Sequence, residues 1–369
     1  MSSGQAHNPG KRPSGASDLP FRPMNAAVIS RQGNPVSPNI DAVSDWPDPP
    51  APSRGEVRLA VEATALNHMD LWVGRGLPGI PLTWPRISGC DVCGTVQAVG
   101  EGVDPSWKGR RVIMNAAVRQ ADRVLPDDPP GSTLAPEYEL LGEHHNGAHC
   151  QFFNAPVNQL AAIGDADPTD AAAFGLTFLT AWGMLRKAEL KPGQSVLVTG
   201  IGGGVATAAM KIAKHLGCEV TVTSRHAWKL EKAQELGADH AILDKGEDWS
   251  REARSITNKR GFDVAVDSIG KATHLWCIKS LARGGAYVTC GATTGPDATT
   301  DLARVFWNQL RILGSTMGSI DEFKEIVSLF RAGSLKPVVD SVHPWSEARK
   351  AWQRLEAGDQ FGNVVLSWK

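Results

Sequence analysis

Residues 196–211 of the chain read Val196-Leu-Val-Thr-Gly200-Ile-Gly202-Gly203-Gly204-Val205-Ala206-Thr-Ala-Ala-Met-Lys211. This order predicts a buried strand, a glycine-rich turn and a helix. Glycines let the backbone turn sharply and approach a pyrophosphate, whose negative charge the free N–H groups at the start of the helix receive. The flanking strand and helix, and a second strand at the right distance, favour a dinucleotide site over a glycine turn without a ligand. We therefore expect a cofactor at Gly200, Gly202, Gly203, Gly204 and Val205.

Strands and helices alternate on both sides of this segment. An Ala-rich helix is expected from Pro168 to residue 185, because Asp167 is a good cap residue and proline is favoured just inside a helix. Apolar runs then predict strands at 195–199, 219–223, 241–244, 263–267 and 286–290, with helices at 203–216 and 228–236. This alternation is typical of an α/β protein with a doubly wound parallel sheet, the Rossmann fold.

The first third of the chain has a different character. Short β-branched or apolar runs at 24–30, 56–63, 94–99 and 110–114 are separated by Gly and Pro, which predicts a compact β-rich domain. Residues 46–52 predict a surface loop, and the polar, proline-rich residues 121–136 predict an irregular lobe. Residues 1–21 are rich in Ser, Gly and Pro and predict a disordered leader or a misassigned start. Late amphipathic helices are expected at 321–331 and 346–356, before a final strand at 363–368.

Composition narrows the function. A chain of 369 residues suggests two domains at roughly 100–200 residues each. The net charge of -1 provides no field of one sign, so neither nucleic acid nor a membrane surface is an expected partner, and a small-molecule substrate remains. Six sparse cysteines do not suggest a disulfide framework and favour a reducing, cytoplasmic location. No apolar run approaches the ~18 residues that a membrane span needs.

The end of the second predicted strand bears on cofactor choice. NAD-selective sites place an acid about 20 residues beyond the glycines, where it binds the ribose 2′-hydroxyl. This chain has Thr223-Ser224-Arg225-His226 there and Lys229 one helical turn later, with no acid. We expect Ser224, Arg225 and Lys229 to hold a 2′-phosphate by charge-assisted bonds, so that NADPH is preferred over NADH. The alternative is a solvated basic start of a helix.

Several further motifs extend this pattern along the chain. They are Ala65-Leu-Asn67-His68-Met-Asp70, Gly89-Cys90-Asp91-Val-Cys-Gly94, Phe174-Gly-Leu-Thr-Phe-Leu-Thr180, Asp267-Ser268-Ile-Gly270, Gly284-Gly285 with Gly291, and Phe361-Gly362-Asn363. With them the chain resembles the medium-chain dehydrogenase/reductase superfamily over residues 24–369, near its zinc-binding alcohol dehydrogenase-like and quinone oxidoreductase branches.

The resemblance implies an architecture. It implies a GroES-like catalytic domain at 22–164, completed by 319–369, beside a Rossmann domain at 165–318. Relatives pair edge strands of the cofactor domain, so a homodimer is expected, with residues 310–315 as the edge strand. Cofactor contacts are implied for Thr180, Ser268, Gly291 and Asn363. Thr180 has the alternative of a core threonine bonded to its own helix, and Asn363 stands where the family usually places Lys or Arg.

The departures from the family concern zinc. Zinc-dependent relatives bind the catalytic metal through Cys, His and Cys, and the matching positions here are Asn67, Cys90 and Leu176. Only the cysteine is a good ligand, whereas a catalytic zinc needs three protein ligands and a water. The four-cysteine structural lobe is also missing from 115–136. We expect no zinc; the alternative is a zinc-dependent alcohol dehydrogenase whose site is rebuilt from neighbouring His68, Asp70, Cys90 and Asp91.

Without a metal, Lewis-acid activation of an alcohol is lost, while reduction of a quinone, an enone or a related activated carbonyl remains feasible. We expect Asn67, His68 and Asp70 at the cleft as catalytic residues. Asn67 would donate to a developing enolate oxygen, and His68 would supply a proton. The alternative is a helix start with Asp70 in its first turn and His68 in solvent. A protein that binds NADPH without catalysing a reaction is a further alternative.

Other groups suggest metal or redox chemistry less strongly. Cys90 and Cys93 have C-x-x-C spacing, yet they lie in a strand-like stretch without a helix start that would lower a thiol pKa, so we expect buried structural thiols. Glu143-His144-His145-Asn146 and His149 are expected in a loop or on a strand surface near the cleft rather than in a metal site, since the adjacent side chains of His144 and His145 point apart in an extended chain.

Overall fold

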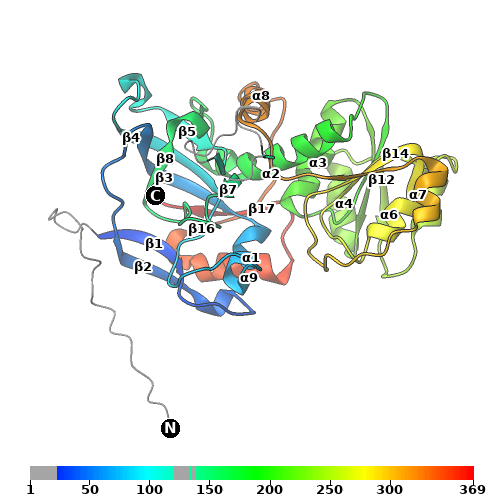
Figure 1. Ribbon diagram of the computed structural model, residues 1–369, viewed down its shortest axis with the longest axis horizontal. Coiled ribbons are helices and arrows are strands. Elements are labelled where there is room, and N and C mark those ends of the chain that lie inside the picture. The colour runs from blue at the N-terminus through cyan, green and yellow to red at the C-terminus, as the bar shows by residue number, and fades with distance from the viewer. Residues whose placement is uncertain (1–22, 120–132, 135–137) are drawn as a thin grey trace, which may run out of the picture.

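The computed structural model describes residues 23–119, 133–134 and 138–369 of the chain. Its elements gather into two lobes, each built on its own sheet (Figure 1). The expected leader at 1–21 and most of the expected irregular lobe at 121–136 lie outside the described residues. Of the helices in the described part of the chain, none combines the length and apolar character that a membrane span requires.

One lobe is built on a six-stranded sheet in which every pairing is parallel. The strand order is β12 (His240–Leu243), β11 (Glu219–Ser224), β10 (Ser195–Val198), β13 (Phe262–Asp267), β14 (Leu281–Thr289) and β15 (Arg311–Gly314). The chain changes direction across the sheet between β10 and β13, and open α/β sheets bind their ligands at such a point. The predicted doubly wound Rossmann fold is confirmed.

Helices alternate with these strands. They are α3 (Gly204–His215), α4 (Ala227–Glu235), α5 (Ser250–Ile256), α6 (His274–Ser280) and α7 (Leu302–Asn308). The start of β14 differs from the expected residue 286. The strand begins at Leu281 because Leu281 pairs with Phe262, and the register then shifts so that Ala286 pairs with Val264.

The other lobe is built on a seven-stranded sheet. Its main order is β16 (Val339–Pro344), β17 (Asn363–Ser367), β3 (Glu56–Leu66), β4 (Asp91–Val99), β5 (Arg111–Met114) and β9 (Leu160–Ala162), and β8 (Phe152–Pro156) also pairs with β3. β4 starts three residues before the expected residue 94, because Asp91 pairs with Ala65 at the extended end of β3. The last strands of the chain thus complete a sheet whose other strands come from the first 162 residues.

Smaller elements complete this lobe. β1 (Pro23–Ile29) and β2 (Ile40–Pro47) form a hairpin, and β6 (Ala117–Arg119) pairs with β7 (Tyr138–Leu140). The expected loop at 46–52 therefore begins only after β2. The helices of this lobe are α1 (His68–Arg75), α8 (Ile320–Arg331) and α9 (Ala348–Ala357), with 3-10 turns η1 (Ser37–Asn39), η2 (Pro105–Trp107), η4 (Val157–Gln159) and η5 (Trp345–Glu347), and α2 (Pro168–Lys187) lies between the two lobes.

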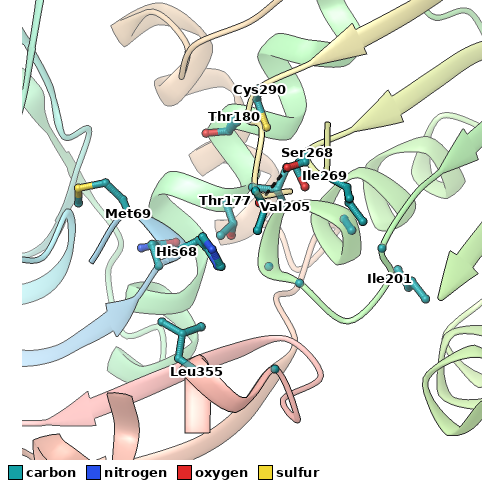
Figure 2. Close-up of a pocket in the computed structure, with 18 of the residues that line it drawn as sticks. His68, Met69, Thr177, Thr180, Ile201, Val205, Ser268, Ile269, Cys290 and Leu355 are labelled. Carbon is teal, nitrogen blue, oxygen red and sulfur yellow. Dashed lines mark hydrogen bonds between the residues drawn. The ribbon is translucent and has the colours of Figure 1, made fainter. Parts of the chain in front are cut away.

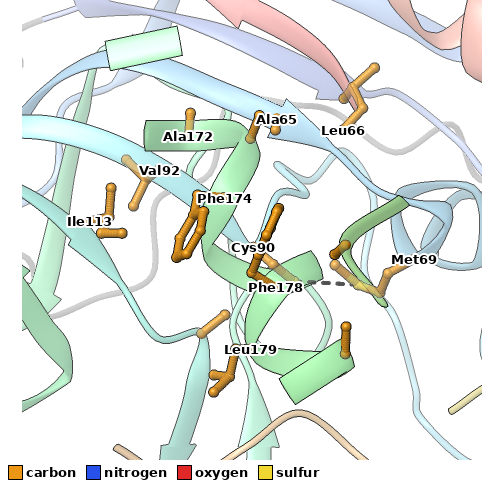
Figure 3. Close-up of a cluster of buried hydrophobic side chains, with 14 of the residues drawn as sticks. Ala65, Leu66, Met69, Cys90, Val92, Ile113, Ala172, Phe174, Phe178 and Leu179 are labelled. Atoms are coloured by element: carbon orange, nitrogen blue, oxygen red, sulfur yellow. Dashed lines mark hydrogen bonds between the residues drawn. The ribbon is translucent and has the colours of Figure 1, made fainter. Parts of the chain in front are cut away.

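Helix α2 joins the two lobes. Its start is as expected, since the Asp167 side chain accepts hydrogen bonds from the Thr169 and Asp170 N–H groups. Phe174 is fully buried and stacks on Phe178 at 4.3 Å between ring centroids. Figure 3 shows these rings beside the side chains of Cys90 and Val92 from the β-rich lobe. Because α2 also packs on α3, one buried helix fixes the position of the cofactor lobe against the other lobe.

Candidate active site

A cavity of about 550 Å³ opens between the lobes. The β-rich lobe contributes the end of β3 and the start of α1. The Rossmann lobe contributes the glycine-rich turn and the carboxyl ends of β11, β13 and β14, and α2 contributes Leu176, Thr177 and Thr180 (Figure 2). Concave sites lined by both lobes at the switch point of a parallel sheet are the usual location of cofactor and substrate.

The glycine-rich turn has the conformation that its sequence predicts. Gly200 and Gly202 have φ values of +66° and +109°, which residues with a Cβ rarely adopt. At Gly204, the first residue of α3, a Cβ would lie 2.7 Å from Thr177 and 2.9 Å from Asn363 Oδ1. Glycine at 204 therefore lets the start of α3 lie directly against the opposite wall, where helix N–H groups favour an anion.

The carboxyl end of β11 brings the expected ribose-side residues together. Ser224 is buried and its Oγ accepts a hydrogen bond from the His226 N–H. Arg225 is exposed, lines the cavity, and has no ion-pair partner among the described residues. Asp244, one of the two acids that the described part of the chain contributes to the lining, accepts from the Gly246 N–H through Oδ1. A free guanidinium thus remains at this end of the cavity.

Lys229 is placed differently from the solvated cation that the alternative required. It is 6% exposed, and its Nζ donates to the Gly358 carbonyl at 2.6 Å. Its side chain covers the glycine-rich turn, with Nζ 3.2 Å from the position a Cβ would take at Gly202. Burial lowers the Lys229 pKa. Lys229 therefore lies over the turn that is expected to hold the pyrophosphate.

The remaining expected cofactor residues also line the cavity: Thr180, Ser268, Gly291 and Asn363. The Thr180 hydroxyl donates to Met317 Sδ at 3.5 Å, whereas it is Thr177 that bonds its own helix, at the Ala173 carbonyl. The alternative of Thr180 as a core threonine bonded to its own helix therefore does not apply.

Both His68 and Asn67 line the cavity, but they differ in what they offer. His68 is half-buried, its Nε2 has no hydrogen-bond partner among the described residues, and its ring packs edge-on against Trp72. Burial, helped by the charge of Arg75, lowers the His68 pKa. This lowered pKa favours the neutral imidazole at neutral pH, and the expected role of His68 as the proton donor stays a prediction.

The side chain of Asn67 is occupied by protein contacts. Its Nδ2 donates to Asp91 Oδ2 at 2.8 Å and to the Ala65 carbonyl at 3.4 Å. These contacts take both N–H groups, so the expected role of Asn67 as a donor to an enolate oxygen does not fit its geometry.

Asp70 lies behind the cavity rather than in its lining. It is fully buried, and its Oδ2 accepts from the Asn67 N–H at 2.7 Å, which caps α1 as the alternative described. Its Oδ1 lies 3.3 Å from Nε2 of the equally buried His149, off the direction of a hydrogen bond. Asp70 thus orients the start of α1, and a direct catalytic role does not fit its position.

The three positions that match zinc ligands do not form a ligand set. Asn67 presents N–H groups rather than a lone pair to its neighbour, and Leu176 has no donor atom. The Cys90 thiol is buried and donates to the Leu141 carbonyl at 2.9 Å, and burial, with nearby Asp70 and Asp91, raises its pKa well above the usual range. Within the described residues, no group of three or more His, Cys, Asp or Glu side chains is arranged to hold a metal ion. The donor chemistry therefore does not fit zinc.

The other cysteines and histidines match their structural interpretations. Cys93 is buried, and burial raises its pKa above that of a free thiol. His144 accepts from the Leu140 N–H through Nδ1, and His145 pairs with Glu139. His149 lies between β7 and β8, outside any helix or strand, but it is fully buried rather than at the surface, and its Nδ1 lies 2.9 Å from the Thr64 hydroxyl.

Several cavity residues were not predicted from the sequence. Trp72, Tyr138, Met317 and Leu355 line the cavity from segments far apart in the chain, whereas Glu143 belongs to a segment that was expected near the cleft. No short motif links them, and only the helical spacing of Trp72 one turn beyond His68 offered a signal. Asp91 was considered only as a ligand for a rebuilt metal site, whereas the structure places it in contact with Asn67 and with the Leu176 N–H.

Comparisons with known proteins agree with this geometry. A family model for the alcohol dehydrogenase GroES-like domain matches residues 53–165, and one for zinc-binding dehydrogenases matches residues 204–332. A zinc-type alcohol dehydrogenase-like protein of Schizosaccharomyces pombe is 31% identical over 322 residues, which cover 85% of this chain and 90% of the relative.

Two NAD-dependent alcohol dehydrogenases are also similar. The enzyme of Sulfurisphaera tokodaii is 28% identical over 335 residues, covering 86% of this chain and 94% of the relative. A crystal structure of an NAD-dependent alcohol dehydrogenase has a TM-score of 0.85 at 37% identity, covering 94% of this chain and all of the other.

Proposed function

The chain belongs to the medium-chain dehydrogenase/reductase superfamily of NAD(P)-dependent oxidoreductases, and we propose that it uses NADPH to reduce a quinone, an enone or a related activated carbonyl without catalytic zinc. The observation that carries this proposal is the contact of Asn67 and the Leu176 N–H with the Asp91 carboxylate. Those two positions would have to hold a metal in a zinc-dependent relative. Because the Cys90 thiol donates to a carbonyl, the residues that the structure describes provide no ligand set for a metal that would activate an alcohol as a Lewis acid.

The preference for NADPH rests on charge at one end of the cavity. Two relatives are named NAD-dependent, but here the end of β11 carries Arg225 and no acid. A 2′-phosphate would meet the free guanidinium of Arg225, and charge-assisted bonds of this kind are stronger than neutral ones. Lys229 and the N–H groups of α3 would hold the pyrophosphate that both cofactors share.

The proposed chemistry assigns His68 the role of a neutral hydrogen-bond donor. When bound, the cofactor supplies a hydride, and in an enone the carbonyl oxygen becomes negative as the β-carbon is reduced. The neutral imidazole of His68 offers an N–H from a half-buried position, where a donor stabilises developing charge more than it does in water. The proton that completes the product at the α-carbon then comes from water.

We further propose that two copies of the chain associate through the edge of the Rossmann sheet. β15 is the last strand of that sheet, and α7 beside it has no buried residue. Three of its apolar side chains, Leu302, Phe306 and Trp307, are 72%, 69% and 68% exposed. A monomer rarely leaves such a patch in water, whereas a second copy would cover it and extend the sheet.

The domain organisation and location are part of the same proposal. The cofactor domain is assigned to 165–318 and the catalytic domain to 22–164 with 319–369, which agrees with the two separate sheets and the return of β16 and β17. All six cysteines are free thiols, which supports a reducing, cytoplasmic location.

Turnover of the purified protein tests the proposal. NADPH or NADH would be mixed with a panel of quinones, enones and simple aldehydes, before and after dialysis against a chelator, and zinc would be measured by elemental analysis. We expect NADPH oxidation with quinones or enones, unchanged by the chelator. Alcohol or aldehyde turnover that disappears with stoichiometric zinc would identify a zinc enzyme instead, and tight NADPH binding without turnover would indicate a non-catalytic protein.

A further inference from the structure

Asp91 joins two walls of the cavity through one buried carboxylate. The residue is 1% exposed at the start of β4. Its Oδ2 accepts from Asn67 Nδ2 at 2.8 Å, and its Oδ1 accepts from the Leu176 N–H at 2.7 Å. Burial, partly offset by these two bonds, raises the Asp91 pKa to about 7. The contact therefore connects the turn before α1 with the middle of α2.

The approach of α2 to this carboxylate depends on a specific residue. In the middle of a helix a backbone N–H ordinarily bonds the carbonyl one turn earlier, so a side-chain acceptor at Leu176 is a departure from the regular pattern. A Cβ at Gly175 would lie 2.5 Å from Asp91 Oδ1. Glycine at 175 thus removes the atom that would keep the helix away from Asp91.

The two joined segments carry the residues that line opposite sides of the cavity. Asn67 is followed directly by His68, whose Nε2 is unpartnered among the described residues. Leu176 is followed by Thr177, which touches the start of α3, and by Thr180 one turn later. The Asp91 bonds therefore connect the segment on the substrate side of the cavity with the segment on the cofactor side.

We propose that Asp91 is a positioning residue, which acts through Asn67 and the Leu176 N–H to fix the distance between the His68 wall and the α2 wall. The inference rests on the proposed function, because the distance matters only where a reduction takes place between these walls. Reactions between two bound groups lose rate steeply when the groups are misplaced by about 1 Å. Asp91 itself does not line the cavity, so its influence on rate is indirect.

Asp91→Asn tests the proposal with little change of shape. A neutral amide has one acceptor oxygen, so one of the two donors loses its bond and the other keeps a weaker one. We expect kcat for the best acceptor to fall about tenfold or more. The isotope effect on kcat with NADPH deuterated at C4 should rise, while the Kd for NADPH stays within about twofold of the wild-type value. An unchanged kcat would overturn the proposal.

A matched control separates positioning from stability. Asp263 also accepts a backbone N–H, that of Ser195, and side-chain bonds from Arg260, but it lies at the start of β13 outside the cavity lining. Asp263→Asn should lower Tm and leave kcat and the isotope effect unchanged. If both variants lower kcat in proportion to their loss of Tm, Asp91 is merely structural and the proposal fails.

A double-mutant cycle tests whether Asp91 acts through Asn67. Asn67→Ala removes the Asn67–Asp91 hydrogen bond by deleting its donor. The double variant Asn67→Ala/Asp91→Asn should therefore have a kcat only slightly lower than that of Asp91→Asn alone. Additive losses would show that the two residues act independently and would overturn the proposed route.

Hydrogen exchange tests the contacts of Asp91 with Asn67 and the Leu176 N–H without measuring turnover. The peptide that contains Leu176 should exchange faster in Asp91→Asn than in the wild type or in Asp263→Asn. Unchanged exchange would refute the claim that Asp91 holds the two walls together. If the wild-type protein reduces no acceptor, the proposed function fails, and the exchange result still decides whether Asp91 holds the two walls together.

Discussion

Reversal of charge at Arg225 should change the cofactor preference of the protein. The side chain is exposed at the carboxyl end of β11, lines the cavity and has no ion-pair partner in the described part of the chain. In Arg225→Glu a cation that attracts a 2′-phosphate becomes an anion that repels it. NADH lacks this phosphate, so the change should act on one cofactor and leave the other almost untouched.

The size of the effect follows from the exposure of the site. Two unit charges about 4 Å apart interact by roughly 1 kcal/mol in water and about 4 kcal/mol near a protein surface of lower dielectric. An exposed side chain belongs toward the lower end of this range, about 1–2 kcal/mol, and reversal removes one such attraction and adds one repulsion. The sum is about 3 kcal/mol, which corresponds to a roughly 100-fold weaker Kd for NADPH.

Fluorescence titration with NADPH and NADH at one fixed ionic strength measures both constants. Arg283→Glu is the matched control, because Arg283 is also exposed but lies near the start of β14. The cavity lies at the carboxyl ends of the strands, whereas Arg283 lies at their amino ends. We expect this control to leave both constants unchanged. An equal loss for NADPH and NADH in Arg225→Glu, or no loss for either, would refute the assignment of Arg225 to the 2′-phosphate.

Other parts of the structure give predictions of their own. Because burial lowers the His68 pKa, the unfolded chain binds a proton at this residue below about pH 6.5 before the folded chain does, so the free energy of unfolding decreases as the pH falls. In His68→Gln, urea unfolding at pH 7.5 and at pH 5.5 should show a smaller difference in the free energy of unfolding than the wild type shows. A difference equal to that of the wild type would contradict this prediction. Phe174→Ala should lower the free energy of unfolding by about 3–5 kcal/mol, since the ring is fully buried between Phe178 and Phe330; a loss below about 1 kcal/mol in chemical denaturation would show that α2 is not the packed centre described above. Trp307→Asp should convert a dimer to a monomer in light scattering at micromolar concentration, and a wild-type protein that is already monomeric would refute the proposed interface. Purified protein should contain far less than one zinc per chain by elemental analysis, and a chelator should change neither Tm nor cofactor binding.

The cofactor end of the cavity was predictable because local sequence determines it. A strand, four closely spaced glycines and a helix can be recognised within 16 residues. The structure places Gly200 and Gly202 at positive φ and Gly204 against the opposite wall, as that motif requires. The absence of an acid directly after β11 is likewise visible in the sequence, without the structure. Each of these features depends on neighbours in the chain.

The substrate end could be predicted only in part, because it depends on contacts between distant segments. His68 was expected in the cavity and lies there, but its unpartnered Nε2 and lowered pKa follow from burial beside Trp72. Asn67 and Asp70 were expected as catalytic groups, and their bonds to Asp91 and to the start of α1 occupy them instead. No spacing rule connects residue 91 with residue 176, so the Asp91 joint needed the structure.

The C-terminal return of the chain has a consequence for how the protein is made. β17 pairs with β3, so that Val364 lies opposite Leu66, and the Gly362 N–H donates to the Gly202 carbonyl in the glycine-rich turn. The Rossmann sheet has all its strands between residues 195 and 314 and can close while the ribosome is still translating the rest. The β-rich lobe is synthesised first, but the part of β3 that pairs with β17 stays unpaired until β17 leaves the ribosome. Unpaired strand edges of this kind promote aggregation of nascent chains. Deletion of even the final few residues would therefore destabilise the β-rich lobe, which is the part of the protein that is synthesised first.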